Sequence, residues 1–208
     1  MILKATHNPF LYGFFRLYTR IRINVSFREV LIEGDVKDTG IPVLVIANHF
    51  SWWDGFWVMY MNMKLFRRKF YFMMLEEQLR KHIFFNKTGG YSVKRGSRST
   101  IESIQYTIEL LKDKNNMVLF FPQGRIVSNY QSSISFEKGI QKVICAVEGK
   151  AQILFEVNLV EYFSHARPSL YIYLFEYRGS GKMEEIEKAY NRFYESTLKT
   201  HSDKKGYE

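Results

Sequence analysis

The sequence is short of cysteine and of long apolar runs, and each shortage excludes a class of protein. Cys145 is the single cysteine among 208 residues, which excludes a disulfide framework and a zinc site built from cysteines. No stretch approaches the roughly 20 apolar residues of a membrane-spanning helix, and the first residues lack the features of a signal peptide. Hydrophobic residues nevertheless make up 46% of the chain, which excludes a disordered protein.

Acidic residues are scarce in two segments, so the formal net charge of +9 is local. Residues 1–28 carry five basic and no acidic side chains, and residues 64–98 carry ten basic and two acidic. Residues 29–63 are acidic, and residues 99–208 carry fourteen charges of each sign. A basic surface attracts phosphate, which occurs in nucleic acids, in anionic membranes and in phosphorylated small molecules.

The start of the chain has the apolar periodicity of a helix. Asn8 before Pro9 is a suitable N-cap with proline at the first helical position. Arginines lie off an apolar stripe made of Phe10, Leu11, Phe14, Leu17, Tyr18 and Ile21. We expect residues 1–24 to form an amphipathic helix that faces a membrane. The alternative is a helix that packs this stripe on the domain core.

The remainder alternates strand and helix patterns. Strands are expected at Val25–Ile32, Pro42–Ala47, Phe70–Leu75, Tyr91–Val93, Met117–Phe121, Ile153–Tyr162 and Leu170–Tyr177. Helices are expected from Gly55 to about Asn62, from Ser99 with a stripe at Ile101, Ile104, Ile108 and Leu111, at Phe136–Val147 and at Met183–Leu198. This order predicts an α/β fold: a single domain at residues 25–200 with a largely parallel central sheet flanked by helices. A frayed tail is expected at residues 201–208.

His49 and Asp54 form an H-x4-D pair directly after the strand expected at Pro42–Ala47. An imidazole can take the proton of an attacking hydroxyl, and a carboxylate can fix its tautomer. The nucleophile can then be the hydroxyl of the substrate itself. The spacing alone is common, but it lies in a dense polar and aromatic cluster at residues 48–55. Asp54 is also expected to cap the following helix.

This cluster, N-H-F-S-W-W-D-G, resembles the first motif of the glycerolipid acyltransferases, the 1-acylglycerol-3-phosphate acyltransferase family. The resemblance implies a glycerol-3-phosphate acyltransferase-like fold, with His49 as general base and Asp54 as the group that orients it. It also implies acyl-CoA or acyl-carrier protein as co-substrate. We expect no bound cofactor and no metal.

Three further segments resemble later blocks of the family. Arg95, preceded by Lys94, stands where the second block has an arginine that binds phosphate. The third block, F-P-E-G-T-R, is matched by Phe121, Pro122, Gln123, Gly124 and Arg125, with glutamine for glutamate and arginine one place early. The fourth block, P-I-x-P-V, is matched by the strand Gln152–Val157 without its prolines. The resemblance implies that Lys94, Arg95 and residues 121–125 bind substrate.

We therefore expect a peripheral enzyme on the cytoplasmic face of a membrane. It would move a fatty acyl group from an acyl thioester to a hydroxyl of a lysophospholipid or related lipid acceptor. Its partners would be the membrane surface, the acceptor and the donor, and not nucleic acid. Three alternatives remain: a non-glycerophosphate acceptor such as an amino lipid or pigment glycoside, a non-catalytic lipid-binding relative, and a basic nucleic-acid-binding module.

Two details of the site are left open by the sequence. Backbone N–H groups around Gly124, or near Ser51 and Trp52, are candidates to stabilise an oxyanion. Aromatic residues after the motif could line an acyl tunnel or fill the core, the commoner role for such residues: Trp52, Trp53, Phe56, Trp57 and Tyr60.

Overall fold

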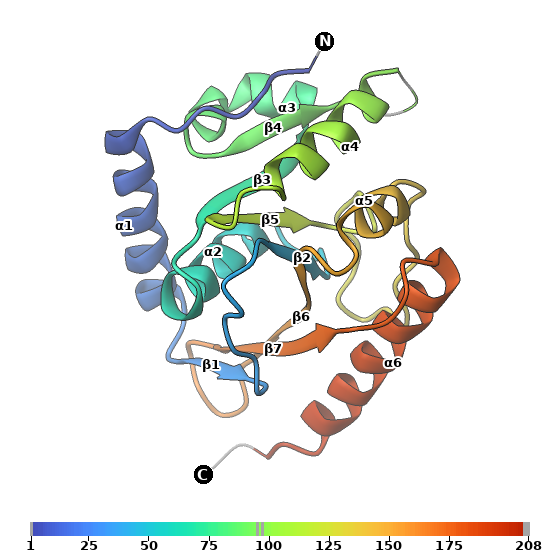
Figure 1. The fold of residues 1–208 in the computed structure, drawn as a ribbon. Helices are drawn as coiled ribbons and strands as arrows, with labels where there is room; N and C mark the ends of the chain where they lie inside the picture. The colour runs from blue at the N-terminus through green and yellow to red at the C-terminus, as the bar shows by residue number, and fades with distance from the viewer. Residues whose placement is uncertain (1, 95, 97, 206–208) are drawn as a thin grey trace.

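A seven-stranded sheet in the order β1-β7-β6-β2-β5-β3-β4 forms the centre of the molecule (Figure 1). The structure, a computed structural model, describes residues 2–94, 96 and 98–205. The strands are β1 (Val30–Glu33), β2 (Val43–Ala47), β3 (Lys69–Leu75), β4 (Gly90–Val93), β5 (Asn116–Phe120), β6 (Gln152–Glu161) and β7 (Ser169–Tyr177). Strand β6 pairs with β7 in antiparallel fashion, and the other described pairs are parallel. The predicted α/β fold with a largely parallel sheet is confirmed.

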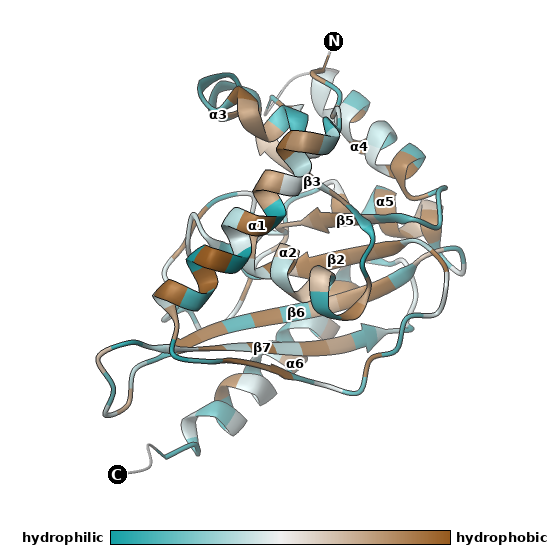
Figure 2. Ribbon diagram, turned by 90° about the vertical axis from the view of Figure 1, so that its left-hand side faces the viewer, coloured by the Kyte–Doolittle hydropathy of each residue, from teal (hydrophilic) through white to brown (hydrophobic). Residues whose placement is uncertain are grey.

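Helices cover both faces of this sheet (Figure 1). They are α1 (Pro9–Ser26), α2 (Asp54–Leu65), α3 (Glu76–Lys81), the 3-10 helix η1 (Ile83–Lys87), α4 (Arg98–Leu110), α5 (Ile140–Val147) and α6 (Met183–Ser202). One core cluster contains residues of α1 and α2, and the other contains residues of α4, α5 and α6. Strand β2 lies between the two clusters, which explains why all five of its residues are buried. The inner strands are correspondingly hydrophobic in Figure 2.

Helix α1 begins at Pro9, as the Asn8 cap predicts, so residues 2–8 of the segment expected at 1–24 lie outside the helix. The Asn8 side chain accepts hydrogen bonds from the backbone N–H groups of Phe10 and Leu11, both at 3.1 Å. The helix continues through Ser26, so the prediction of a strand starting at Val25 is wrong. Burial of Ile23 and the hydrogen bond from the Phe27 N–H to the Ile23 carbonyl extend the helix past the β-branched residues.

Helix α5 is shorter than predicted. The pattern indicates a helix from Phe136, but α5 starts only at Ile140. The N–H of Glu137 donates to the Pro122 carbonyl at 2.8 Å, which ties this segment to the loop after β5. A long-range partner for that N–H replaces a local helical one, and the segment before Ile140 stays outside the helix.

The end of the last predicted helix, at Leu198, and one predicted helix stripe also need correction. Helix α6 continues to Ser202, and Nδ1 of His201 lies 2.9 Å from the Tyr173 hydroxyl. Lys204 pairs with Glu33 at 3.0 Å, so the tail is anchored up to this point. In α4, Ile101 is 52% exposed, because the helix turns it away from the core. Helices α3 and η1 have no counterpart among the predicted elements.

Candidate functional site

The candidate site lies at the edge of the sheet where the parallel strands β2, β5, β3 and β4 end. Because these strands run in one direction, the residues that follow each of them gather at the same edge. His49 follows β2, the turn that starts at Phe121 follows β5, and Lys94 follows β4. The fold thereby brings separate blocks of the sequence to one edge.

His49 and Asp54 form a hydrogen-bonded pair at this edge. Nδ1 of His49 lies 2.9 Å from Oδ2 of Asp54. The Asp54 side chain is fully buried, whereas 18% of the His49 side chain is exposed. With Nδ1 bound to the carboxylate, Nε2 is the ring nitrogen left to exchange a proton with a bound molecule.

Asp54 also holds the loop that leads into α2. Its Oδ2 accepts hydrogen bonds from the backbone N–H groups of Phe50 at 2.7 Å and Ser51 at 2.9 Å. The expected cap is wrong: Asp54 is the first residue of α2, and its carboxylate turns back to these donors. Burial raises the pKa of the Asp54 carboxyl, and the hydrogen bond from His49 opposes that rise.

The turn after β5 holds His49 from the other side. The Phe121 ring stacks on the imidazole, with ring centres 3.9 Å apart and planes within 9°. Oε1 of Gln123 accepts from the His49 N–H at 2.8 Å, and the Val127 N–H donates to the His49 carbonyl at 3.0 Å. Gly124 has a φ of 62°, which lets the chain turn so tightly.

Asn48 and Asn158 join β2 to β6 where their ladder ends. Nδ2 of Asn48 donates to the Asn158 carbonyl at 3.0 Å, and its Oδ1 accepts from the Asn158 N–H at 2.8 Å. The amide thus takes the place of a backbone peptide and extends the pairing by one step. His49 is fixed as a consequence, because it follows Asn48 directly.

A buried acid lies beside this bridge. Glu156 is fully buried in β6, and its Oε1 accepts from Nδ2 of Asn158 at 2.9 Å. The Tyr190 hydroxyl of α6 donates to the Glu156 carbonyl at 2.9 Å. Burial raises the pKa of Glu156 to about 8, helped by the charge of Asp54. Sequence reasoning missed this group, although an acid and an amide inside an apolar strand were the available signal.

The remaining predicted site residues differ in their surroundings. Lys94 is exposed after β4, and its carbonyl accepts from the Thr100 hydroxyl at 2.8 Å. Pro122 is buried in the turn, and Arg125 is exposed. Arg95 lies outside the described residues. The structure therefore brings Phe121 and Gln123 into contact with His49 and leaves Lys94 and Arg125 facing solvent.

The aromatic residues after the motif divide between core and surface. Phe56 and Trp57 are 7% and 5% exposed and belong to the core on the α1 and α2 side, as is common for such residues. Trp52 is 40% exposed and faces His82. A small hollow of about 60 Å³ between α1 and the start of α2 is lined by Arg22, Ile23, Ser26, Phe27, Trp53, Phe56 and Trp57.

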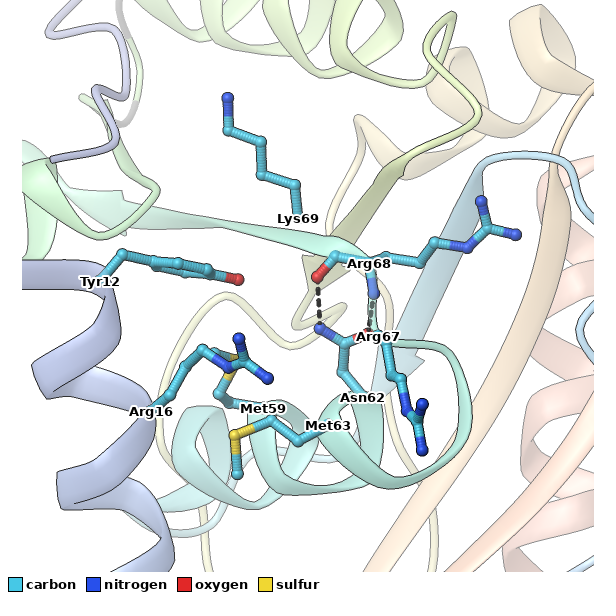
Figure 3. Close-up of a pocket in the computed structure, with 8 residues that line it drawn as sticks. All are labelled: Tyr12, Arg16, Met59, Asn62, Met63, Arg67, Arg68 and Lys69. Carbon is cyan, nitrogen blue, oxygen red and sulfur yellow. Dashed lines mark hydrogen bonds between the residues drawn. The ribbon is translucent and has the colours of Figure 1, made fainter. Parts of the chain in front are cut away.

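A larger, basic hollow lies at the other end of α2. It measures about 220 Å³ and is lined by Tyr12, Arg16, Met59, Asn62, Met63, Arg67, Arg68 and Lys69 (Figure 3). The Asn62 amide shapes its wall through hydrogen bonds of 2.9 Å to both the N–H and the carbonyl of Arg68. It is separate from the His49 site, because it adjoins the end of α2 and Asp54 begins that helix.

No group of three or more histidine, cysteine, aspartate or glutamate side chains among the described residues could hold a metal ion. None of the described helices is long and apolar enough to cross a membrane.

Comparisons with known proteins agree with the fold. The model of a protein family described as Acyltransferase matches residues 22–155, more than half of the chain. No curated protein matches the sequence. The crystal structure of PlsC, the 1-acyl-sn-glycerophosphate (LPA) acyltransferase from Thermotoga maritima, is similar with a TM-score of 0.60 and 16% identity. That match covers 94% of this chain and 81% of PlsC. The chain belongs to the Acyltransferase family, which confirms the resemblance seen in the sequence.

Proposed function

As a member of the Acyltransferase family the protein transfers acyl groups, and we propose that the acceptor is a hydroxyl of a lysophospholipid or related lipid. The donor in this proposal is an acyl thioester, either acyl-CoA or acyl-carrier protein. The observation that carries it is the hydrogen bond between His49 and the buried Asp54 at the carboxyl edge of the sheet.

In the proposed reaction Nε2 of His49 removes the proton of the acceptor hydroxyl as the oxygen attacks the thioester carbon. Asp54 supports this role through Oδ2, which accepts hydrogen bonds from two backbone N–H groups. Because this oxygen acts as an acceptor, the proton of the His49–Asp54 hydrogen bond belongs on Nδ1 of His49. Nε2 is then unprotonated and able to act as a base. The carbon–sulfur bond breaks as the tetrahedral intermediate collapses, and His49 returns the proton to the leaving thiolate.

The negative charge on the thioester oxygen needs a hydrogen-bond donor. Two of the N–H groups expected for this purpose are already used: Ser51 donates to Asp54, and Gly124 donates to the Phe121 carbonyl at 3.1 Å. We assign the hydrogen bond to this oxyanion to the N–H of Trp52, which has no hydrogen-bond partner among the described residues.

Replacement of His49 tests the reaction. His49→Ala should lower acyl transfer by about a hundredfold to ten-thousandfold, the usual contribution of a general base. His7→Ala is the matched control, because His7 is also partly buried but bonds to the Phe70 carbonyl at the opposite edge of the sheet. Transfer of a labelled acyl group from acyl-CoA to lysophosphatidic acid and to uncharged lysolipids would be measured. Substantial activity in His49→Ala would disprove the mechanism, and the preferred acceptor would identify the lipid class.

We also propose that α1 rests on the cytoplasmic surface of a membrane. Its inner side is buried through Phe15 and Ile23, while its outer side exposes a stripe of five apolar residues: Phe10, Phe14, Leu17, Ile21 and Val25. Such a stripe, with arginines beside it, suits an interfacial helix. The basic hollow of Figure 3 adjoins α1 through Arg16, and its charge suits anionic headgroups.

Binding to lipid vesicles tests this surface. Phe14→Asp with Leu17→Asp should abolish sedimentation with anionic vesicles, because both side chains are more than half exposed on the stripe. Ile101→Asp is the control, since Ile101 is similarly exposed on α4, on the other face of the sheet. Equal binding of the wild type, the Phe14→Asp and Leu17→Asp double variant and Ile101→Asp would refute the proposal that α1 rests on a membrane.

A further inference from the structure

Near the site, two carboxyl oxygen atoms are buried without a hydrogen-bond partner in the part of the chain that the structure describes. They are Oδ1 of Asp54 and Oε2 of Glu156. Each is the second oxygen of a group whose first oxygen is satisfied, by three N–H donors in Asp54 and by Asn158 in Glu156. A buried oxygen without a partner is costly, so two of them call for a common explanation.

The two groups lie on the same face of the sheet. Side chains alternate along β6, and Leu154 belongs to the core on the α1 and α2 side whereas Phe155 and Val157 belong to the other. Glu156 therefore points to the side of α2, which Asp54 begins. In the sheet register Glu156 pairs with Ala47, two residues before His49. Their charges interact, because ionised Asp54 raises the pKa of Glu156.

One proton shared by this pair would satisfy both oxygen atoms. Two buried carboxyl groups whose charges interact do not both ionise easily, and such a pair tends to retain a proton. Asp54 receives three N–H donors and Glu156 one, so the negative charge is better stabilised on Asp54. The proton accordingly belongs on Glu156.

We propose that Glu156 is a positioning residue for the acyl-transfer site: its protonated Oε2 donates a hydrogen bond to Oδ1 of Asp54, directly or through one water. This contact keeps Asp54 ionised and turns its Oδ2 toward His49. The inference rests on the proposed function for its catalytic meaning, but the protonation of Glu156 can be measured without any activity.

The groups packed against Glu156 favour this state at neutral pH. Asp54 lies on the same side of the sheet as the Glu156 carboxyl, and the Tyr190 hydroxyl of α6 bonds to the backbone carbonyl of Glu156 on the other side. Burial raises the pKa of the Tyr190 phenol well above its usual value, so this hydroxyl stays a neutral donor. Ionisation of Glu156 above about pH 8 would place a second negative charge beside Asp54 and remove the proposed hydrogen bond.

Substitutions at Glu156 separate positioning from simple packing. Glu156→Leu removes the donor and should lower kcat about tenfold, in line with a hydrogen bond to a charged group, with little change in KM. Glu156→Gln keeps an N–H donor, should recover most of that loss, and should abolish the decline of kcat above about pH 8. The control is Asn116→Leu, because Asn116 is buried and bonds to the Leu110 carbonyl at the other edge of the sheet. Equal losses in the two Glu156 variants, or an alkaline decline that persists in Glu156→Gln, would overturn the proposal.

Infrared spectroscopy reads the proton itself. The wild-type protein should show the C=O stretch of a protonated carboxylic acid at neutral pH, lost as the pH rises past about 8 and absent from Glu156→Gln. If no such band exists, Glu156 is ionised and the inference is wrong. If the band is present but His49→Ala retains full activity, the proposed function fails and the protonated pair stands.

Discussion

The pH dependence of stability should change when Glu156 becomes glutamine. In the native protein burial raises the pKa of Glu156 to about 8, whereas the unfolded carboxyl titrates near the ordinary value of 4.5. Between these two values the native state binds one proton more than the unfolded state. The free energy of unfolding of the wild type therefore falls as the pH rises through this window.

The size of the effect follows from that single proton. Each pH unit inside the window lowers the free energy of unfolding by about 1.4 kcal/mol. From about pH 5.5 to about pH 7.5 the wild type should lose about 2.5 kcal/mol relative to Glu156→Gln, whose amide does not titrate. His7, whose pKa is lowered to about 4 by burial, contributes an opposite trend below about pH 6.5. Because it is present in both proteins, it cancels in the difference.

Urea unfolding of both proteins at several pH values measures this difference. The two linear extrapolations should diverge steadily with pH, with equal m-values if both proteins unfold to the same extent. A constant difference across the window would refute the argument, because it would mean that Glu156 is ionised in the native state or solvated well enough to titrate normally.

Three further predictions concern the groups around His49. Asp54→Asn should lower kcat about a hundredfold or more, measured by acyl transfer, and wild-type rates would exclude an orienting role. Asn48→Ala removes both hydrogen bonds to Asn158, so urea unfolding should show a loss of about 2 to 4 kcal/mol, and a change near zero would contradict the bridge. Gln123→Glu keeps the acceptor for the His49 N–H but adds an acid, so kcat should fall. Adding Glu156→Gln should recover part of that loss, whereas additive losses in the double variant would exclude coupling between positions 123 and 156.

Much of the fold could be predicted because the buried strands are short, apolar and clearly separated. The strand expected at Pro42–Ala47 and the helix capped by Asn8 are examples, since local patterns decide both. The errors occur where distant contacts override local preference. The pattern at Phe136 predicts a helix, but the N–H of the adjacent Glu137 bonds to the Pro122 carbonyl, and no local pattern shows that contact.

The candidate site could be predicted in part for the same reason. His49 and Asp54 are five residues apart, and a tight loop brings them together. Glu156 reaches the site through sheet register, which no spacing in the sequence reveals. The bond between Oε1 of Gln123 and the backbone of His49 comes from a loop 74 residues further along the chain, so no local pattern shows it, and substrate binding by Gln123 stays a prediction.

Two of the departures from the family pattern, at Gln123 and Glu156, both change the charge near His49. Where the third block of the family has glutamate, this chain has Gln123, which supplies a neutral oxygen to the His49 N–H. Where the fourth block has no acid, Glu156 adds a buried carboxyl that feels the charge of Asp54. An ionised side chain at position 123 would bring a further negative charge to a site that already holds two buried carboxyl groups. A neutral residue at 123 therefore makes an acid at 156 easier to accommodate. Substitutions at the two positions should be better tolerated together than singly.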